Sequence, residues 1–390
     1  MSVGVSIPGA FAKTDFDNHG DLATLPTHAR AGDFVDVNLG ATLQFGAVGF
    51  AATGDLQQFS LTTSAAQGLS LQIGRWKGLG AWGMYDGQLV IGGGARVVTM
   101  QIVGNGRTLL TMTGIGPEAG ALLMPTGRQW RVGITGRAPV RGGIFGSEDV
   151  TIDAGVRRAG PFVLPSTVVM PWEIEAGLAY QLGPRPLNPG WENPHDQEDR
   201  LRRRIENDRA DRAALRDREM IATPTGRREH LRIELEAEED DFRVIEDREL
   251  AAEVARLRRI RLARYENWPR EKILLLASLL LTGPSARAVS LEGFLDQRAE
   301  SVGNTVSLTP RLGVEGEPLR GRMLLRAGTY LESSRYEGGG PRQHFTFGSD
   351  VRLFPLDFWG LLPRATWKVE LFVDVAPRYA NGGIGIGNWH

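Results

Sequence analysis

Hydrophobic and polar residues alternate without a break near the start of the chain. From Phe34 to Phe45 the sequence reads F-V-D-V-N-L-G-A-T-L-Q-F, so Val35, Val37 and Leu39 fall on one side of an extended chain. Because successive side chains of a β-strand point to opposite faces, this segment predicts a strand with one apolar and one polar face. The same alternation returns at 168–182, 305–315, 322–332, 344–354 and 366–376.

The length of these segments separates two kinds of β-protein. Strands of soluble sandwiches usually have about five or six residues, whereas a strand that crosses a bilayer at a tilt needs about nine to eleven. The alternating segments match the second class, so they favour membrane-spanning strands. A soluble β-protein with a coiled-coil arm is the more distant interpretation.

Alternation and turn residues together predict about fourteen strands, an even number as in bacterial single-chain barrels. We expect them at 2–10, 34–46, 47–63, 69–84, 88–103, 113–124, 129–139, 168–182, 272–282, 304–315, 320–332, 343–354, 366–376 and 382–389. Short connections (85–87, 125–128, 315–320 and 355–364) alternate with long ones (12–33, 141–167, 283–303 and 333–343). Short periplasmic turns opposite long external loops are typical of outer-membrane proteins. The predicted fold class is therefore an all-β transmembrane barrel with antiparallel strands.

One connection departs from this scheme, because residues 184–271 stand where a short turn is expected and are rich in Arg, Glu and Asp. Apolar residues recur at helical spacing within 197–220 and 241–265, which predicts an amphipathic α-helical hairpin, while the intervening L-R-I-E-L-E is compatible with a short strand. The barrel is then divided into residues 1–183 and 272–390. By turn parity the hairpin lies in the periplasm, as a solvated helical pair or as a module that binds a periplasmic protein.

Charged residues recur on the polar faces of the predicted strands. An arginine or lysine at the lipid midplane of a barrel costs about 2–4 kcal/mol, so the polar faces are expected to line the lumen. Acids and bases are nearly balanced there, which favours pairing across the interior over a wide pore that selects by charge. The predicted lumen charges are Asp36, Arg96, Glu118, Arg131, Glu173, Glu175, Arg311, Arg326, Asp350, Arg352, Lys368, Glu370 and Asp374.

The third predicted strand changes its alternation. Val48 and Phe50 share one face, whereas Phe59 and Leu61 share the other. An extra residue at a β-bulge would produce this change, and glycine tolerates the geometry of a bulge. The sequence therefore predicts a kink or a gap at Thr53, Gly54 and Asp55, with a strand that ends at Ala52 as the alternative.

Composition narrows the possible chemistry. The formal net charge is −1, which gives no reason to expect nucleic acid as a partner, and the chain has no cysteine. The six histidines show no metal-ligand spacing, and no G-x-S-x-G elbow or phosphate loop is present, so we expect neither an enzyme nor a cofactor or metal. No apolar run approaches the eighteen residues of a spanning helix, and no secretory signal is visible at the amino terminus.

Several segments resemble the FadL-type family of outer-membrane transporters for long-chain fatty acids and other hydrophobic compounds. They are W-E-I-E-A-G-L-A-Y at 172–180, V-S-L-T-P-R-L-G-V-E at 306–315 and R-M-L-L-R-A-G-T-Y-L-E at 322–332, together with the strand count and Gly54. The resemblance covers the barrel and excludes the helical insert. Members of that family carry an amino-terminal plug with an Asn-Pro-Ala motif ahead of the first strand, whereas here the first predicted strand begins at residue two or three.

The resemblance implies uptake of hydrophobic small molecules across the outer membrane of a Gram-negative bacterium, with lateral exit through a gap in the third strand. The expected partners are membrane lipid, a hydrophobic small molecule and, through residues 184–271, a periplasmic protein, and the barrel is expected to be a monomer. The alternative function is a barrel that transports nothing and anchors a periplasmic partner on the helical module. The candidate ligand-binding residues are Phe50, Leu56, Phe59, Met100 and Tyr330.

Overall fold

The computed structural model divides the chain into two compact units, which are described separately below. The first unit comprises Met1–Gly190 and Arg270–His390, and the second comprises Trp191–Pro269. The structure describes residues 2–9, 35–61, 69–104, 107–144, 150–153, 156–159, 162–163, 168–184, 186–188, 194–266, 272–285, 302–355 and 366–388.

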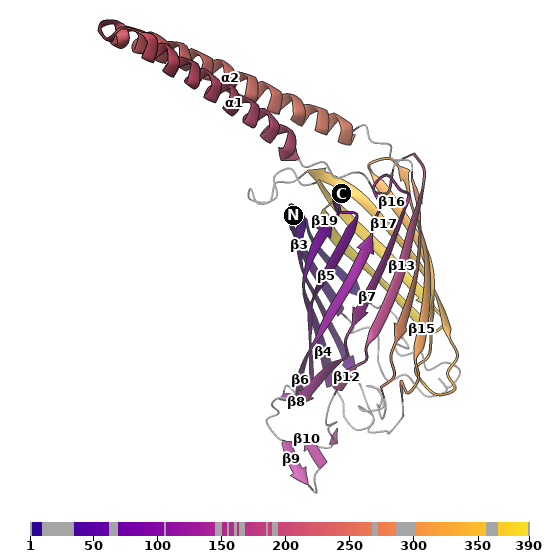
Figure 1. Ribbon diagram of the computed structural model, residues 1–390. Coiled ribbons are helices and arrows are strands. Elements are labelled where there is room, and N and C mark those ends of the chain that lie inside the picture. Colours follow the sequence, from indigo (N-terminus) through magenta and orange to yellow (C-terminus); the bar gives the residue numbers. More distant parts are fainter. Residues whose placement is uncertain are drawn as a thin grey trace. The chain divides into compact units, whose positions relative to one another are not determined.

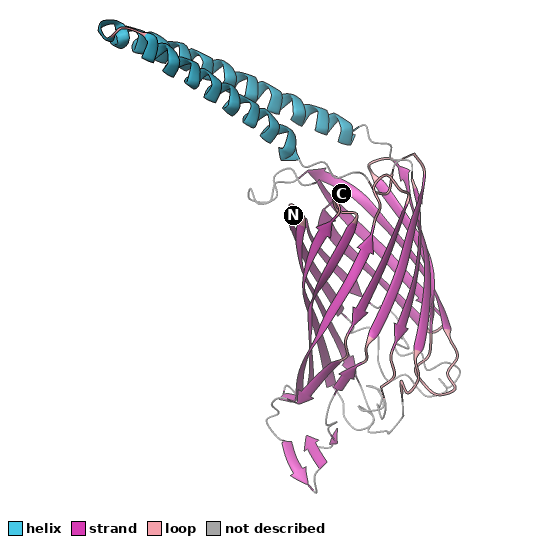
Figure 2. Ribbon diagram, viewed as in Figure 1, coloured by secondary structure: helices cyan, strands magenta, loops and turns pink. Residues whose placement is uncertain are grey.

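The first unit is a closed antiparallel β-barrel (Figures 1 and 2). Its amino-terminal part consists of β1 (Ser2–Gly9), β2 (Val35–Phe45), β3 (Val48–Leu61), β4 (Leu69–Met84), β5 (Leu89–Gly104), β6 (Arg107–Leu123), β7 (Trp130–Arg137), β8 (Val140–Ile144), β12 (Val168–Met170) and β13 (Glu173–Leu182). Its carboxyl-terminal part consists of β14 (Ile273–Thr282), β15 (Ser307–Leu319), β16 (Met323–Glu332), β17 (Arg342–Pro355), β18 (Thr366–Ala376) and β19 (Tyr379–Asn388).

Backbone pairing closes the ring in two places. β1 pairs with β19, which joins the two ends of the chain, and β7 pairs with both β6 and β13. Closure pairs the first described strand with the last, and a closed sheet is the form in which β-strands can cross lipid. The predicted barrel fold is confirmed, and each predicted strand is present with ends that differ by a few residues.

Two strands of the wall are each interrupted by two residues, and both halves of each strand pair with the same neighbouring strand. β7 and β8 both pair with β6 and are separated by Ala138 and Pro139, where the register shifts by one residue. β12 and β13 flank Pro171 and Trp172 and keep one register with β8 and β7. The sheet of 16 described strand segments therefore forms a wall of fourteen strands, since each of these two pairs counts as one wall strand.

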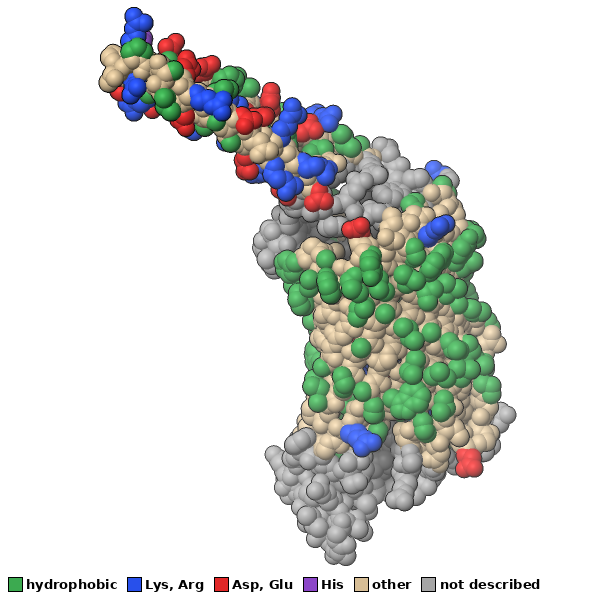
Figure 3. Space-filling view, in the orientation of Figure 1, with side chains coloured by type: hydrophobic (Ala, Val, Ile, Leu, Met, Phe, Trp, Pro, Cys, Tyr) green, Lys and Arg blue, Asp and Glu red, His purple; other side chains and the backbone are tan. Residues whose placement is uncertain are grey.

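The outer face of the wall is apolar, as Figure 3 shows for one side of the barrel. Leu312 on β15 is 62% exposed, Phe347 on β17 57% and Leu371 on β18 49%. The neighbours of each residue along its own strand point inward. Large exposed apolar surfaces are rare on soluble monomers, and a lipid-facing wall requires them.

β3 corrects the sequence prediction of a kink or gap. Its pairing with β2 runs from Val48 through Gln58 and its pairing with β4 runs through Leu61, both without a register shift. The predicted break at Thr53, Gly54 and Asp55 is therefore wrong, and so is the alternative that the strand ends at Ala52. The strand has no inserted residue, so Phe59 and Leu61 share the backbone parity of Asp55, which is an inward position.

A small separate sheet lies in a long connection of the first unit. It consists of β9 (Val150–Asp153), β10 (Val156–Ala159) and β11 (Phe162–Val163), paired in the order β11-β10-β9. The sequence analysis treated residues 141–167 as a loop and did not predict it, because each strand has at most four residues.

The second unit is a helical hairpin made of α1 (Pro194–Ala222), the short 3-10 helix η3 (Thr225–Arg227) and α2 (Arg228–Glu266). The segment L-R-I-E-L-E belongs to α2, so the helical interpretation of this region holds and the strand does not. In the described part of the chain, neither long helix has an apolar stretch sufficient to cross a membrane.

Ion pairs hold the seam between α1 and α2. Glu246 accepts hydrogen bonds from Arg209 Nε at 2.6 Å and from Arg212 Nη2 at 2.5 Å, and Glu239 lies 3.3 Å from Arg216. Glu239 and Glu246 are only 5% and 8% exposed and are seven residues apart, so they lie on the same side of α2.

Candidate functional site

The candidate site is the lumen of the barrel, defined here as the space lined by the inward-facing side of the strands. Register and burial identify that side, because buried charges such as Arg96, Glu118 and Asp350 alternate with exposed apolar residues. The structure places all of the predicted lumen charges on inward positions. What the sequence could not reveal is which of them are partners.

One group of partners links β5, β6, β7 and β13. Arg137 lies 3.7 Å from Glu118, 3.5 Å from Glu173 and 3.1 Å from Glu175. Arg96, which is 4% exposed, lies 3.4 Å from Glu173. Arg96 also donates to the carbonyl of Ala138 at 2.8 Å, so the break between β7 and β8 supplies a hydrogen-bond acceptor for a buried guanidinium.

A second group follows β15 to β18. Arg326 donates to both oxygens of Asp350, at 2.7 and 2.9 Å, and to Glu315 at 3.0 Å. Lys368 donates to Asp350 at 2.8 Å and also contacts Glu370. Bidentate arginine–carboxylate pairs fix geometry as well as charge, so this group ties neighbouring strands together across the inner face.

Arg311 on β15 extends the first group, since its Nη1 lies 3.3 Å from Glu175 on β13. The remaining predicted charges have other partners. Arg131 donates to Asn188 and to the carbonyl of Leu187, both at 2.6 Å, and Arg352 donates to the carbonyl of Gly321 at 3.3 Å. The Asp36 carboxylate accepts from Asn38 at 3.4 Å.

A third cluster surrounds His344, which is 1% exposed. Its Nδ1 is 2.9 Å from Asp374 and its Nε2 is 3.0 Å from Glu332, and its ring stacks on Tyr330 with 4.2 Å between ring centroids. Tyr330 also donates to Asp374 at 2.7 Å. The sequence singled out Tyr330 and Asp374 but not His344, although its place on the polar face of an alternating strand was a usable signal.

Apolar side chains occupy part of the lumen on β4, β5 and β6. They are inward by register, and each is at most 8% exposed. We call them the lumen apolar cluster: Leu71, Met100, Ile102, Leu110 and Met112. Of these the sequence analysis proposed only Met100, because it assigned apolar residues to lipid by default.

Two predicted ligand-binding positions are corrected by the register. Phe50 and Leu56 have the parity of Val48 on β3 and are 52% and 43% exposed on the outer face, so they do not line the lumen. Met100 and Tyr330 are inward. Phe59 pairs with Leu71 through its backbone, and its side chain lies outside the described residues.

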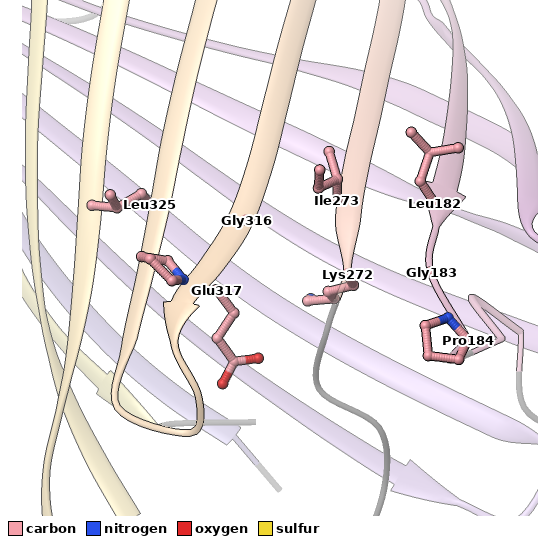
Figure 4. A pocket seen from close by; sticks show the side chains of 9 residues that line it. Leu182, Gly183, Pro184, Lys272, Ile273, Gly316, Glu317 and Leu325 are labelled. Carbon is pink, nitrogen blue, oxygen red and sulfur yellow. The ribbon is translucent and has the colours of Figure 1, made fainter.

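Grooves indent the described part of the wall, and they include the following two. One, of about 610 Å³, is shown in Figure 4 and lies where β13 ends and β14 begins. Its apolar side is formed by Leu182, Ile273 and Leu325, and Lys272 and Glu317 lie at its polar edge. The other, of about 530 Å³, lies beside Gly54 and Trp76. Among the described residues, no group of three or more His, Cys, Asp or Glu side chains is arranged to hold a metal ion.

No protein-family model and no curated protein matches the chain. Among solved structures it is similar to the CymD monoaromatic hydrocarbon channel, with 8% identity and a TM-score of 0.46 over 99% of this chain and 86% of that one. It is also similar to a Pseudomonas aeruginosa FadL homologue, with 9% identity and a TM-score of 0.44 over 99% and 88% of the two chains. The deltaS2 mutant of the TodX monoaromatic hydrocarbon channel has 10% identity and a TM-score of 0.42, over 100% and 90%.

Proposed function

We propose that this protein is an outer-membrane channel for the uptake of hydrophobic small molecules, and that the solute binds in the lumen. The observation that carries the proposal is the lumen apolar cluster. A water-filled barrel has a polar inner face, whereas here the inner faces of three adjacent strands present Leu, Met and Ile side chains. An apolar solute gains free energy by moving from water onto such a surface.

The lumen charges support the same function by their pairing. Arg96, Arg137 and Arg326 each lie within 3.5 Å of a carboxylate, so positive charge is compensated locally. A channel that attracts ions by charge would bias its lining toward one sign. The paired lining instead leaves the apolar cluster as the surface that distinguishes one solute from another.

Long-chain fatty acids are the solute class we propose. Arg75 on β4 is inward by register, is two residues from the inward Ile73 and has a side chain that is 39% exposed. It lies 3.5 Å from Asp55 and is in reach of an entering anion. A fatty acid would place its chain on the apolar cluster and its carboxylate on Arg75, the charge-assisted contact that guanidinium groups make best.

The path proposed here stays within the lumen and uses no opening in β3. The lateral exit that the sequence suggested required a break at Gly54, and continuous pairing of β3 on both edges removes that break. We further propose that the connection carrying the helical hairpin is periplasmic. Leu182 and Ile273 end their strands at the same side of the barrel as the tight turn at Gly46, and short turns are periplasmic in this class of barrel.

Binding of a fluorescent long-chain fatty acid to the purified protein in detergent tests the proposal. Met112→Glu places a charge in the apolar cluster and should weaken binding at least tenfold, while Arg75→Gln should weaken the acid but not the matching long-chain alcohol. Thr135→Glu, an inward position on β7, is the matched control. Equal affinity of the Met112→Glu variant and the unaltered protein would contradict the proposal.

A second candidate function is anchoring of a partner by the helical hairpin, because apolar side chains on α2 are exposed. Ile233 is 57% exposed and Ile245 51%. Deletion of residues 190–268 separates the two functions. Uptake that survives the deletion assigns transport to the barrel alone, and uptake that disappears from an intact barrel assigns the hairpin a part in it.

A further inference from the structure

α2 has a second face that does not contact α1. Glu239 and Glu246 mark the seam, and a residue two positions from Glu246 is turned by about 200° around the helix axis. Val244, two positions from Glu246, therefore points away from the seam, and Ile245, one position from Glu246, lies about 100° to the side of it; they are 49% and 51% exposed. Four further exposed residues share this side at spacings of three, four and seven. We call the set the outer stripe of α2: Ala237, Asp241, Val244, Ile245, Arg248 and Ala252.

The two charges of the outer stripe have no partner within the part of the chain that the structure describes. Neither Asp241 nor Arg248 makes a hydrogen bond or an ion pair there. Some other surface charges of α2 are paired within the helix, since Arg243 lies 3.6 Å from Asp240 and Arg256 2.8 Å from Glu253. An acid and a base seven residues apart thus remain available on an apolar face.

The outer stripe is arranged symmetrically about one point. Asp241 and Arg248 are equally far from the midpoint between Val244 and Ile245, about 5 Å along the axis in either direction. Ala237 and Ala252 are likewise equidistant from it. If a second copy of α2 is laid antiparallel on the first about this midpoint, each Asp241 faces an Arg248, the Val244 and Ile245 side chains meet at the centre, and the alanines allow close approach.

We propose that the outer stripe of α2 binds the same stripe of a second copy of this chain in an antiparallel arrangement. Charge complementarity points to the occupant, because an antiparallel copy of the stripe completes two Asp241–Arg248 pairs. The pairs select the register and the central aliphatic residues supply apolar burial. This inference does not depend on the proposed solute, and it replaces the monomer expected from the sequence by a dimer.

Charge reversal in the full-length protein tests the inference. Asp241→Arg and Arg248→Asp each put like charges face to face, so either change alone should shift the protein in detergent from dimer to monomer, with at least a tenfold higher dissociation constant by sedimentation. The double variant Asp241→Arg and Arg248→Asp restores both pairs with exchanged signs and should recover the dimer. Asp217→Arg, an exposed change of equal charge on α1, should have no effect.

Cross-linking provides a second measurement. The chain has no cysteine, so Ile245→Cys introduces a single thiol at the centre of the stripe. A short bismaleimide should link this variant into dimers, and should not link Arg218→Cys on α1. A monomer at all protein concentrations, single reversals without effect, or a double reversal that stays monomeric would each overturn the proposal. Circular dichroism of each variant confirms that the helices are intact.

Discussion

Trp76 lies directly over Gly54 on the outer face of the wall. The two residues are register partners on β3 and β4, and a Cβ atom at Gly54 would come within 2.6 Å of Trp76 Cε3. Real Cβ atoms do not approach a ring so closely, so any side chain at this position would displace the indole. Glycine here marks a close packing contact in an uninterrupted strand, and it is not evidence of a bulge.

The first prediction concerns this contact. Gly54→Ala should lower the free energy of unfolding by about 1–3 kcal/mol, because the indole must leave its position or the strand must shift. Urea unfolding in detergent, followed by Trp fluorescence, measures the change. Gly78→Ala is the matched control, since a Cβ at Gly78 meets no atom within 4 Å. If both variants lose the same stability, the Trp76 contact is not the reason for the glycine.

The barrel could be predicted from the sequence because its wall obeys a strict rule. A lipid-facing position must be apolar and a charge must face inward, so the alternation that places Leu371 outside also places Glu370 inside. Strand positions and the inward set of charges follow from that period alone. The register between strands does not follow from it. Arg326 and Asp350 were therefore both expected in the lumen, but their bidentate pairing was not.

The rule fails where the inner face is also apolar. Leu71, Met100 and Met112 are buried inside the barrel, and a sequence pattern cannot distinguish them from lipid-facing residues when both faces of a strand are apolar. The same ambiguity produced the false break in β3. Apolar residues of changed parity suggested an inserted residue, whereas the strand keeps its register with β4 through Leu61.

The second prediction concerns Asp350, which is 2% exposed and contacts both Arg326 and Lys368. Asp350→Asn removes the carboxylate that these two cations share. Because the Arg326 side chain is 42% exposed and keeps Glu315 as a partner, the loss should be smaller than the roughly 3–5 kcal/mol typical of a fully buried pair. Glu370→Gln should cost less, because that side chain is 34% exposed. Heat-dependent mobility in gel electrophoresis compares their stabilities, and a larger loss for Glu370→Gln would contradict the assignment.

The third prediction concerns ion selectivity. Arg137 is shared by Glu118, Glu173 and Glu175, so Arg137→Gln leaves three carboxylates near one point of the lumen with less compensation. The variant should shift the reversal potential in planar bilayers toward cation selectivity. Arg131→Gln removes the same charge from a position whose partners are Asn188 and a backbone carbonyl. An equal shift in both variants would show that total charge matters and the pairing does not.

The fourth prediction concerns the pH dependence of the helical hairpin. Burial alone would raise the pKa of Glu246, but hydrogen bonds from Arg209 and Arg212 outweigh burial and lower it below its usual range. A carboxyl group whose pKa is lower in the folded state stabilises the fold fully above its unfolded-state value, about 4.3, and loses that contribution as the pH falls through the folded-state value. The hairpin should therefore lose stability below about pH 4.

Circular dichroism at 222 nm during thermal unfolding, from pH 7 to pH 2, measures this contribution in the full-length protein. Glu246→Gln should lower the unfolding temperature of the helices at pH 7, and its difference from the unaltered protein should shrink as the pH falls toward 2 and Glu246 becomes protonated. Glu229→Gln is the matched control, because Glu229 pairs with Arg232 on the same helix but is 73% exposed, so solvent screens its pair. A difference for Glu246→Gln that persists unchanged at pH 2 would mean that packing, and not the charge of Glu246, holds the seam.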